Sequence, residues 1–347
     1  MNISAKVLSK GWGNNGLFRK DLAKITFEGK VIPREDNNIM HVKLKEELER
    51  HGHTINTSDL VNDESKIDIE FHFDYNLKKN SNKPSYMILP EVHEIFIDNR
   101  YEKLSKDFDK IFTFNDSHVD NKKFIKLVHP ILFNNEGPIS LYEKKYFSCL
   151  IGSNKSLQKK YNNCGYTERF KLAKWFNNYH PELFNLYGLG WKNFFFKPDT
   201  FSKIIYKITD KTKLYPNYLK KVYKGPIKSK TETLKQHNFT FCYENALNVP
   251  GYFCELIFDA FNGMCVPIYW GCNNVKKYIP ENCFIDRRDF SNNEELIKYL
   301  RSIDEKTYGE FQSNIIKFKK SNKIKIFSIE NFVNTIVNTL NSDYPNR

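Results

Sequence analysis

The sequence predicts an α/β protein of two units, each built on a parallel sheet that helices cover on both faces. Two observations support this prediction. Strand-like and helix-like segments alternate along the chain on either side of a basic middle stretch. The chain also has 347 residues, which is enough for two domains with separate hydrophobic cores.

The first domain is expected to span residues 1–150. Residues 39–51 space their apolar side chains as a helix does, Gly52 stops this helix, and the chain continues as a strand at 53–56. A second helix is expected over 92–105. Short apolar or alternating runs predict the other strands of this domain, at 65–72, 86–89, 108–114 and 146–151.

The second domain is expected to span residues 151–325, followed by a closing helix and tail at 326–347. A helix over 168–179 carries Arg169 in its first turn, and Ser291 and Glu294 have the spacing of a capping box. The other expected elements are strands at 237–245, 265–271 and 282–286 and a helix at 251–262. Two such domains imply a cleft between them, which is a usual place for a small ligand.

The net charge of +13 is concentrated in one stretch. Between Ile151 and Thr240 the chain has 18 Lys and Arg but 5 Asp and Glu. The net charge of this stretch, +13, equals that of the whole chain. Such a stretch is either a solvated lysine-rich surface or a binding region for phosphorylated small molecules, anionic membrane or nucleic acid. Nucleic acid is not the expected partner, because the aromatic residues 194–196 form a block typical of packing and no nucleic-acid-binding motif accompanies them.

Composition predicts a cytoplasmic protein without a metal. The amino terminus lacks the apolar core of a signal peptide, and no apolar run is long enough to span a membrane. The seven cysteines form no C-x-x-C pair and lie in apolar runs, so we expect reduced core thiols. Asp107 and Asp109 have D-x-D spacing but open an apolar strand, so we expect them to be structural. No dinucleotide, P-loop, G-x-S-x-G or H-E-x-x-H motif is present.

Residues 239–290 are the most informative segment. A strand ends at Glu244 and Asn245, a Pro/Gly turn follows, and a helix is expected to begin with Tyr252 and Glu255 in its first turn. Free N–H groups at a helix amino terminus favour a phosphate, and a carboxylate such as that of Glu255 can accept hydrogen bonds from sugar hydroxyls. Glu255 is explained equally well as a favourable carboxylate near a helix amino terminus.

Four stretches of this segment resemble, in order and spacing, the donor-binding signature of glycosyltransferase family 10, the α-1,3/1,4-fucosyltransferases. They are FTFCYEN, GYFCELIFDAF, CVPIYWGCNNVKKYIP and CFIDRRDF. The helix with Arg169 resembles the family helix whose arginine binds the donor pyrophosphate, and FDKIFTFN resembles a strand of the family. Residues 1–80 and 185–235 show no such match.

The resemblance implies a GT-B fold, in which two Rossmann-like domains, one for the acceptor and one for the nucleotide sugar, face a central cleft and the last helix crosses back. It also implies an inverting transfer from GDP-fucose to a glycan hydroxyl that needs no metal or other cofactor. The base that takes the acceptor proton would be Glu91, with Glu94 second, although each is also explained as an ordinary surface carboxylate. By resemblance, the donor-binding residues are Arg169, Asn245, Tyr252 and Glu255.

The sequence departs from the family pattern at one important position. Where the family has T-E-K, this chain has Cys254-Glu255-Leu256, so the lysine that reaches the donor phosphates is missing. Lys276, Lys277 or a cation from 203–235 can compensate. Otherwise the donor is not GDP-fucose, or activity is lost. We favour retained transfer, because an arginine and a helix amino terminus still neutralise part of the diphosphate charge.

The function predicted from the sequence is therefore that of a cytoplasmic fucosyltransferase with a surface-polysaccharide or lipopolysaccharide type of acceptor. Such acceptors are made at the inner membrane face, where the basic segment would suit anionic lipid, so peripheral membrane binding is part of the expectation. The alternatives are a transferase of the same fold with another nucleotide-sugar donor, and a non-catalytic glycan- or nucleotide-binding protein. A nucleic-acid-binding protein has only the net charge in its favour.

Overall fold

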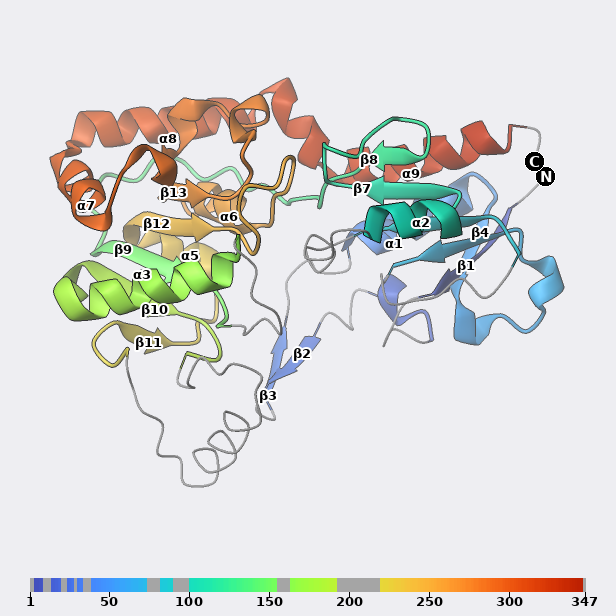
Figure 1. The fold of residues 1–347 in the computed structure, drawn as a ribbon, viewed down its shortest axis with the longest axis horizontal. Helices are drawn as coiled ribbons and strands as arrows, with labels where there is room; N and C mark the ends of the chain where they lie inside the picture. The colour runs from blue at the N-terminus through green and yellow to red at the C-terminus, as the bar shows by residue number, and fades with distance from the viewer. Residues whose placement is uncertain are drawn as a thin grey trace. The chain divides into compact units, whose positions relative to one another are not determined.

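The computed structural model describes residues 3–8, 14–19, 24–27, 30–33, 39–73, 82–89, 100–154, 163–191 and 219–345. The chain divides into two compact units, Met1–Leu132 with Ile324–Arg347 and Phe133–Lys323, and each contains a six-stranded sheet (Figure 1). A separate antiparallel ribbon consists of β2 (Lys24–Phe27) and β3 (Lys30–Pro33). The predicted α/β fold class, with two sheet domains, is confirmed.

The first sheet is entirely parallel, with the strand order β4-β1-β5-β6-β7-β8. Every residue of the inner strands β5 and β6 is buried, and the buried polar Glu70 is paired, with Oε1 2.9 Å from Lys6 Nζ. The strands are β1 (Ser4–Leu8), β4 (Thr54–Thr57), β5 (Ile69–His72), β6 (Ser85–Ile88), β7 (Lys110–Thr113) and β8 (Phe124–Lys126).

The described helices of the first unit are α1 (Ile39–Arg50), α2 (Arg100–Asp107) and α9 (Ile329–Asp343). α1 ends just before Gly52, whose φ of 81° few other residues adopt. α9 joins the core formed by α1 and the first sheet, although it comes last in the sequence. The Asp343 carboxylate at its end accepts a hydrogen bond from the Tyr86 hydroxyl and lies 3.2 Å from Lys110 Nζ. The last helix therefore completes the first unit.

The second sheet is also parallel, with the strand order β11-β10-β9-β12-β13-β14. Leu172 and Phe176 of α3 pack with Phe239 and Phe241 in the large core of this unit. The strands are β9 (Tyr146–Ile151), β10 (Phe184–Tyr187), β11 (Tyr223–Gly225), β12 (His237–Tyr243), β13 (Val266–Trp270) and β14 (Ile285–Asp286).

Helices cover this second sheet and connect its strands. The described α-helices of this unit are α3 (Gly165–Tyr179), α5 (Lys230–Lys235), α6 (Leu256–Asn262), α7 (Asn293–Ser302) and α8 (Glu305–Lys319). Short 3-10 helices occur in both units, at Gly16–Phe18, Ser58–Leu60, Glu64–Lys66, Pro181–Leu183, Val275–Lys277, Glu281–Cys283, Arg287–Asp289 and Asn322–Phe327.

The strand expected at 146–151 is present, but it does not end the first unit. As β9 it lies between β10 and β12 in the second sheet, and the chain divides at Phe133. An apolar run predicts that a strand forms without specifying its neighbours. Here the parallel pairing with β12, for example Tyr146 with His237, decides to which sheet the strand belongs.

The ends of two helices also differ from the sequence prediction. α7 is capped by Asn292, whose side chain accepts the Glu295 N–H at 2.9 Å, so the N-cap lies one residue later than Ser291. α6 begins at Leu256 and not at 251. α8 has no counterpart among the predicted elements, because one position of its buried stripe is the polar Gln312, which donates to Met264 O at 2.7 Å.

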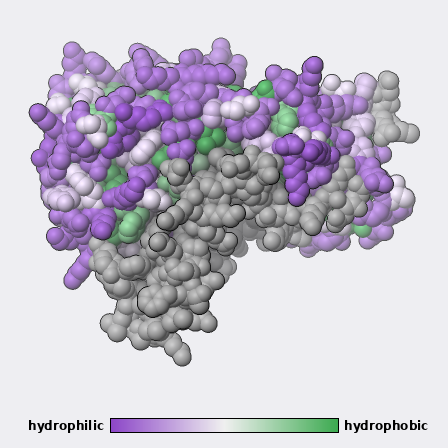
Figure 2. All heavy atoms as spheres, viewed as in Figure 1, coloured by the Kyte–Doolittle hydropathy of each residue, from purple (hydrophilic) through white to green (hydrophobic). Residues whose placement is uncertain are grey.

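The described part of the molecule has a predominantly polar exterior on the face visible in Figure 2. None of its helices combines the length and the apolar character that crossing a bilayer requires.

Candidate functional site

The second sheet has a polar edge where its strands end. β9, β12 and β13 are parallel neighbours, so their carboxyl ends lie together. Ligands of open α/β sheets bind outside this edge. β12 ends at Tyr243, and the next residues, Glu244 and Asn245, leave the sheet at this point.

α3 meets this edge at its first residue, Gly165. The Gly165 N–H donates to Asn245 O at 3.0 Å, and Cys164 pairs with Ala246 in an isolated bridge. A Cβ atom on Gly165 would lie 1.6 Å from Glu244 O, much closer than any real contact. The helix can therefore approach the strand end this closely only because its first residue has no side chain.

One turn further along α3, Arg169 turns its guanidinium onto the end of β12. The residue is 4% exposed. Its Nε donates to Tyr243 O at 2.7 Å, and its Nη2 donates to Tyr243 O and, at 3.0 Å, to Asn245 Oδ1. The structure therefore brings together two of the residues predicted to bind the donor. A guanidinium has five N–H donors, so Arg169 can hold an anion as well as these oxygens.

Glu244 is a buried acid beside this pair, and the sequence indicated it only as the end of a strand. Its side chain has no exposure, and Oε2 accepts the Cys254 N–H at 3.1 Å. Burial raises the pKa of Glu244 to about 7, although hydrogen bonds from Cys254 and the charge of Arg169 oppose the rise. A Cβ atom at Gly271 would lie 2.2 Å from Glu244 Cγ. The burial thus depends on a glycine that directly follows β13, which no local pattern reveals.

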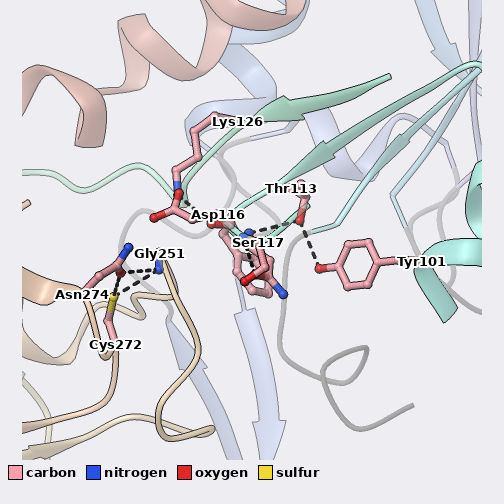
Figure 3. Close-up of polar contacts among 10 residues, drawn as sticks. Tyr101, Thr113, Asp116, Ser117, Lys126, Gly251, Cys272 and Asn274 are labelled. Atoms are coloured by element: carbon pink, nitrogen blue, oxygen red, sulfur yellow. Dashed lines mark hydrogen bonds and ion pairs between the residues drawn. The ribbon is translucent and has the colours of Figure 1, made fainter. Parts of the chain in front are cut away.

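The segment before α6 is a turn, and the expected helix start at Tyr252 is wrong. Gly251 has a φ of 74°, and its N–H donates to Asn274 Oδ1 at 2.9 Å and to Cys272 Sγ at 3.1 Å (Figure 3). The Cys254 N–H, which a helix start would have left free for a phosphate, is bound by Glu244. The left-handed glycine and this carboxylate hold the chain out of the helix until Leu256.

Glu255 lies half-exposed at the start of α6. Its Oε1 is 2.8 Å from Lys230 Nζ, which is also 2.7 Å from Asp259 Oδ2. Burial lowers the pKa of Lys230, but the two carboxylates outweigh burial and raise it above its usual value, so the ammonium stays charged. Lys230 is the basic-segment cation that the sequence could not single out. Tyr252, also predicted to bind the donor, is 3% exposed, and its hydroxyl lies 2.9 Å from Cys254 Sγ.

The two lysines considered as replacements for the family lysine contact other side chains. Lys276 pairs with Glu281 at 2.8 Å, and Lys277 Nζ lies 5.6 Å from the centre of the Tyr278 ring. Leu256, at the position of that lysine, lines a small cavity together with Lys230. The cavity that Leu256 lines is thus also lined by a cation of α5 and by the carboxylate of Asp259.

Glu91 and Glu94 lie outside the described residues. They follow β6, whose carboxyl end shares one edge of the first sheet with those of β7 and β8. The described carboxylate that follows β7 is Asp116, which pairs with Lys126 at 2.8 Å (Figure 3).

The two aspartates of the D-x-D pair lie at the end of α2 and directly before β7. Asp107 ends α2, and Asp109 Oδ2 accepts the Ser85 N–H at 2.8 Å. In the described ranges, no three His, Cys, Asp or Glu side chains come together in a way that could hold a metal ion. The seven cysteines are free thiols, and only Cys254 among them is partly exposed.

Comparison with known proteins identifies the segment that contains Asn245, Tyr252 and Glu255. Residues 198–335 match the family model described as glycosyltransferase family 10 (fucosyltransferase) C-term. The matched residues make up about two fifths of the chain. The resemblance stated from the sequence motifs is thereby confirmed for the part of the chain that carried them.

Two curated proteins match parts of the chain. An α-(1,3)-fucosyltransferase (FucT) of Helicobacter pylori is 39% identical over 75 residues, which are 22% of this chain and 16% of that protein. An α-(1,4)-fucosyltransferase of Arabidopsis thaliana is 30% identical over 82 residues, which are 23% of this chain and 20% of that protein. The matched segments thus span a fifth or less of both relatives.

The fold matches over nearly the whole chain. A crystal structure of an α1,3-fucosyltransferase with GDP has a TM-score of 0.54 and 17% identity, and the match covers 99% of this chain and 91% of that one. At this identity the match establishes the fold. The protein therefore has two parallel-sheet domains of the GT-B type, and the residues that match the family 10 model form much of the second.

We predict that Gly165→Ala destabilises the second unit by roughly 1–3 kcal/mol or more, because the new methyl group must push α3 away from Glu244. Gly309→Ala is the matched control. Gly309 also lies in a helix, but nothing lies within 4 Å of its added Cβ, so alanine should be neutral or stabilise by about 0.5–1 kcal/mol. Urea unfolding of both variants measures the difference. Equal stabilities would contradict the close approach.

Proposed function

We propose that the protein is an inverting glycosyltransferase that moves fucose from GDP-fucose to a hydroxyl group of a glycan. The observation that carries the proposal is the buried contact of Arg169 with Asn245. It places a fixed positive charge directly on the family 10 segment, at the sheet edge where α/β proteins bind ligands.

In this proposal Arg169 and Asn245 bind the diphosphate, and Tyr252 and Glu255 bind the rest of the donor. The bond between the sugar C1 and the diphosphate oxygen breaks while a bond from the acceptor oxygen to C1 forms. Glu91 takes the acceptor proton. Arg169 stabilises the negative charge that develops on the departing nucleotide diphosphate, so the proposal includes no metal or other cofactor.

The acceptor in this proposal is an intermediate of a surface polysaccharide or lipopolysaccharide. We place the protein in the cytoplasm, at the inner membrane face where such acceptors are made. The basic stretch between Ile151 and Thr240 supports this, because its excess of 18 Lys and Arg over 5 Asp and Glu would attract anionic lipid.

The absence of a lysine at position 256 favours two alternatives. The first is a transferase of the same fold with a different nucleotide-sugar donor, in which Leu256 packs against the sugar or base. The second is a protein that binds a glycan or a nucleotide without catalysis. Lys230 argues for retained transfer, because its ammonium group contacts Glu255 next to the position of the missing charge.

The function is tested by incubating the protein with glycan acceptors and a panel of nucleotide sugars, and measuring nucleotide release with and without a chelator. We expect release from GDP-fucose, unchanged by the chelator. Release from another nucleotide sugar alone would support the first alternative, and binding without release would support the second. Loss of release in the chelator, with recovery on adding a divalent ion, would contradict the metal-free mechanism.

We predict that Glu91→Gln lowers turnover by roughly 10²-fold or more and leaves donor affinity unchanged, as expected for loss of a general base. Glu94→Gln is the matched control, because it removes a neighbouring carboxylate from the same segment. Steady-state rates and donor titrations check both variants. If Glu91→Gln keeps full turnover, the base is another carboxylate, such as Glu94 or Asp116.

We predict that Leu256→Lys tightens the binding of GDP-fucose, since a charge-assisted contact to phosphate contributes about 1.5–3 kcal/mol. Leu256→Met, which keeps an apolar side chain without the charge, should bind as the parent does. Titration of the three proteins with GDP-fucose measures the effect. Weaker binding by the lysine variant alone would show that Leu256 packs against an apolar part of the ligand.

A further inference from the structure

Glu244 is a buried acid to which the proposed transfer assigns no role. Its side chain has no exposure, and its Oε1 has no hydrogen-bond partner in the described part of the chain. Buried carboxyl oxygens are nearly always partnered in folded proteins. A buried, incompletely bonded carboxyl group at a ligand-binding edge therefore calls for a functional explanation.

Charged and titratable groups face Glu244 from each element packed against it. They are Arg169 of α3, Cys242 of β12, Tyr269 of β13, and Cys254 and Glu255 of the turn before α6. Arg169 is the positive charge in this set, and it also contacts Asn245. Burial raises the pKa of the Cys242 and Cys254 thiols and of the Tyr269 hydroxyl well above neutrality. Those three groups stay protonated where Glu244 changes charge.

We propose that Glu244 is a positioning residue for the donor, and that its carboxyl group takes up one proton from solvent when a nucleotide diphosphate binds at Arg169 and Asn245. This inference rests on the proposed donor site. It adds to that site a proton-linked group that does not itself touch the donor.

The charge of Arg169 links the binding of the diphosphate to the uptake of a proton by Glu244. Without ligand, the guanidinium lowers the pKa of Glu244 and so favours the carboxylate. A diphosphate brings further negative charge to the same guanidinium in a site where burial makes charge interactions strong. The carboxylate then loses part of its compensation and gains repulsion, so its neutral form becomes the more stable one.

The neutral acid can still position the turn. One carboxyl oxygen continues to accept the Cys254 N–H, which keeps Glu255 at the start of α6, and the proton resides on Oε1, the oxygen that lacks a partner. Binding thus changes the charge of Glu244 without releasing the turn.

The sign of the pH dependence follows from this linkage. Burial sets the pKa of the free site near 7, and the bound anion raises it further. Below the free pKa the proton is already present, and the affinity does not change with pH. Between the free and bound pKa values, each pH unit upward weakens donor binding, approaching about tenfold per unit.

A nucleotide sugar is the appropriate probe. Both ends of its diphosphate are esterified, so it has no phosphate ionisation near neutrality, whereas the terminal phosphate of a free nucleotide titrates near pH 6. Calorimetric titration with GDP-fucose between pH 6 and 8.5, in buffers of different ionisation enthalpy, measures both the affinity and the number of protons taken up. We expect proton uptake and an affinity that falls as pH rises.

Glu244→Gln keeps the shape of the side chain but cannot ionise. We expect this variant to bind without proton uptake and with a pH-independent affinity. Glu136→Gln is the control, because Glu136 is a surface carboxylate of the same unit, paired with Lys235 at 2.8 Å. It should retain both effects.

Three results separate the possible failures. Binding by the parent protein without proton uptake would overturn the inference, and this measurement needs no variant. Proton uptake that persists in Glu244→Gln would also overturn it, because a different group would then carry the proton. Binding of no nucleotide sugar at any pH would defeat the proposed function itself.

Discussion

The close approach of α3 to the end of β12 is the contact on which the candidate site depends. Gly165 lies so near the Glu244 carbonyl that no other residue fits without displacing the helix. This approach puts Arg169, one turn later, onto Tyr243 O and Asn245. The position of the main positive charge therefore follows from a backbone contact between two elements that are distant in the sequence.

The charged groups near the turn before α6 form two sets, one buried and one partly exposed. Arg169 and Glu244 are buried, so their charges interact strongly and Glu244 changes its protonation state near neutrality. Glu255 and Lys230 are partly exposed and paired, and water screens their interaction. At position 256 the family pattern has lysine and this chain has leucine. Lys230 of α5 thus supplies an ammonium group close to this position.

Much of the fold could be predicted, because each domain repeats a simple alternation. The apolar runs of β5, β7, β12 and β13 identified strands, and Gly52 ended α1 as expected. The failures have local causes. Gln312 concealed α8, and the Glu244 carboxylate kept residues 252–255 out of α6. In both places a polar side chain bonds to a backbone group outside its own helix or strand, which periodicity cannot anticipate.

The sequence by itself determined the α/β class, the family 10 segment and the polar residues at the end of β12, because residue type and spacing encode these directly. Only the tertiary structure decided that β9 joins the second sheet, that Lys230 contacts Glu255, and that Glu244 is buried beside Arg169. The physical reason is that burial and charge pairing depend on which distant elements come into contact. Gly165 permits the close approach of α3 to Glu244 and Gly271 leaves room for the Glu244 side chain, and these roles are visible only in the folded chain.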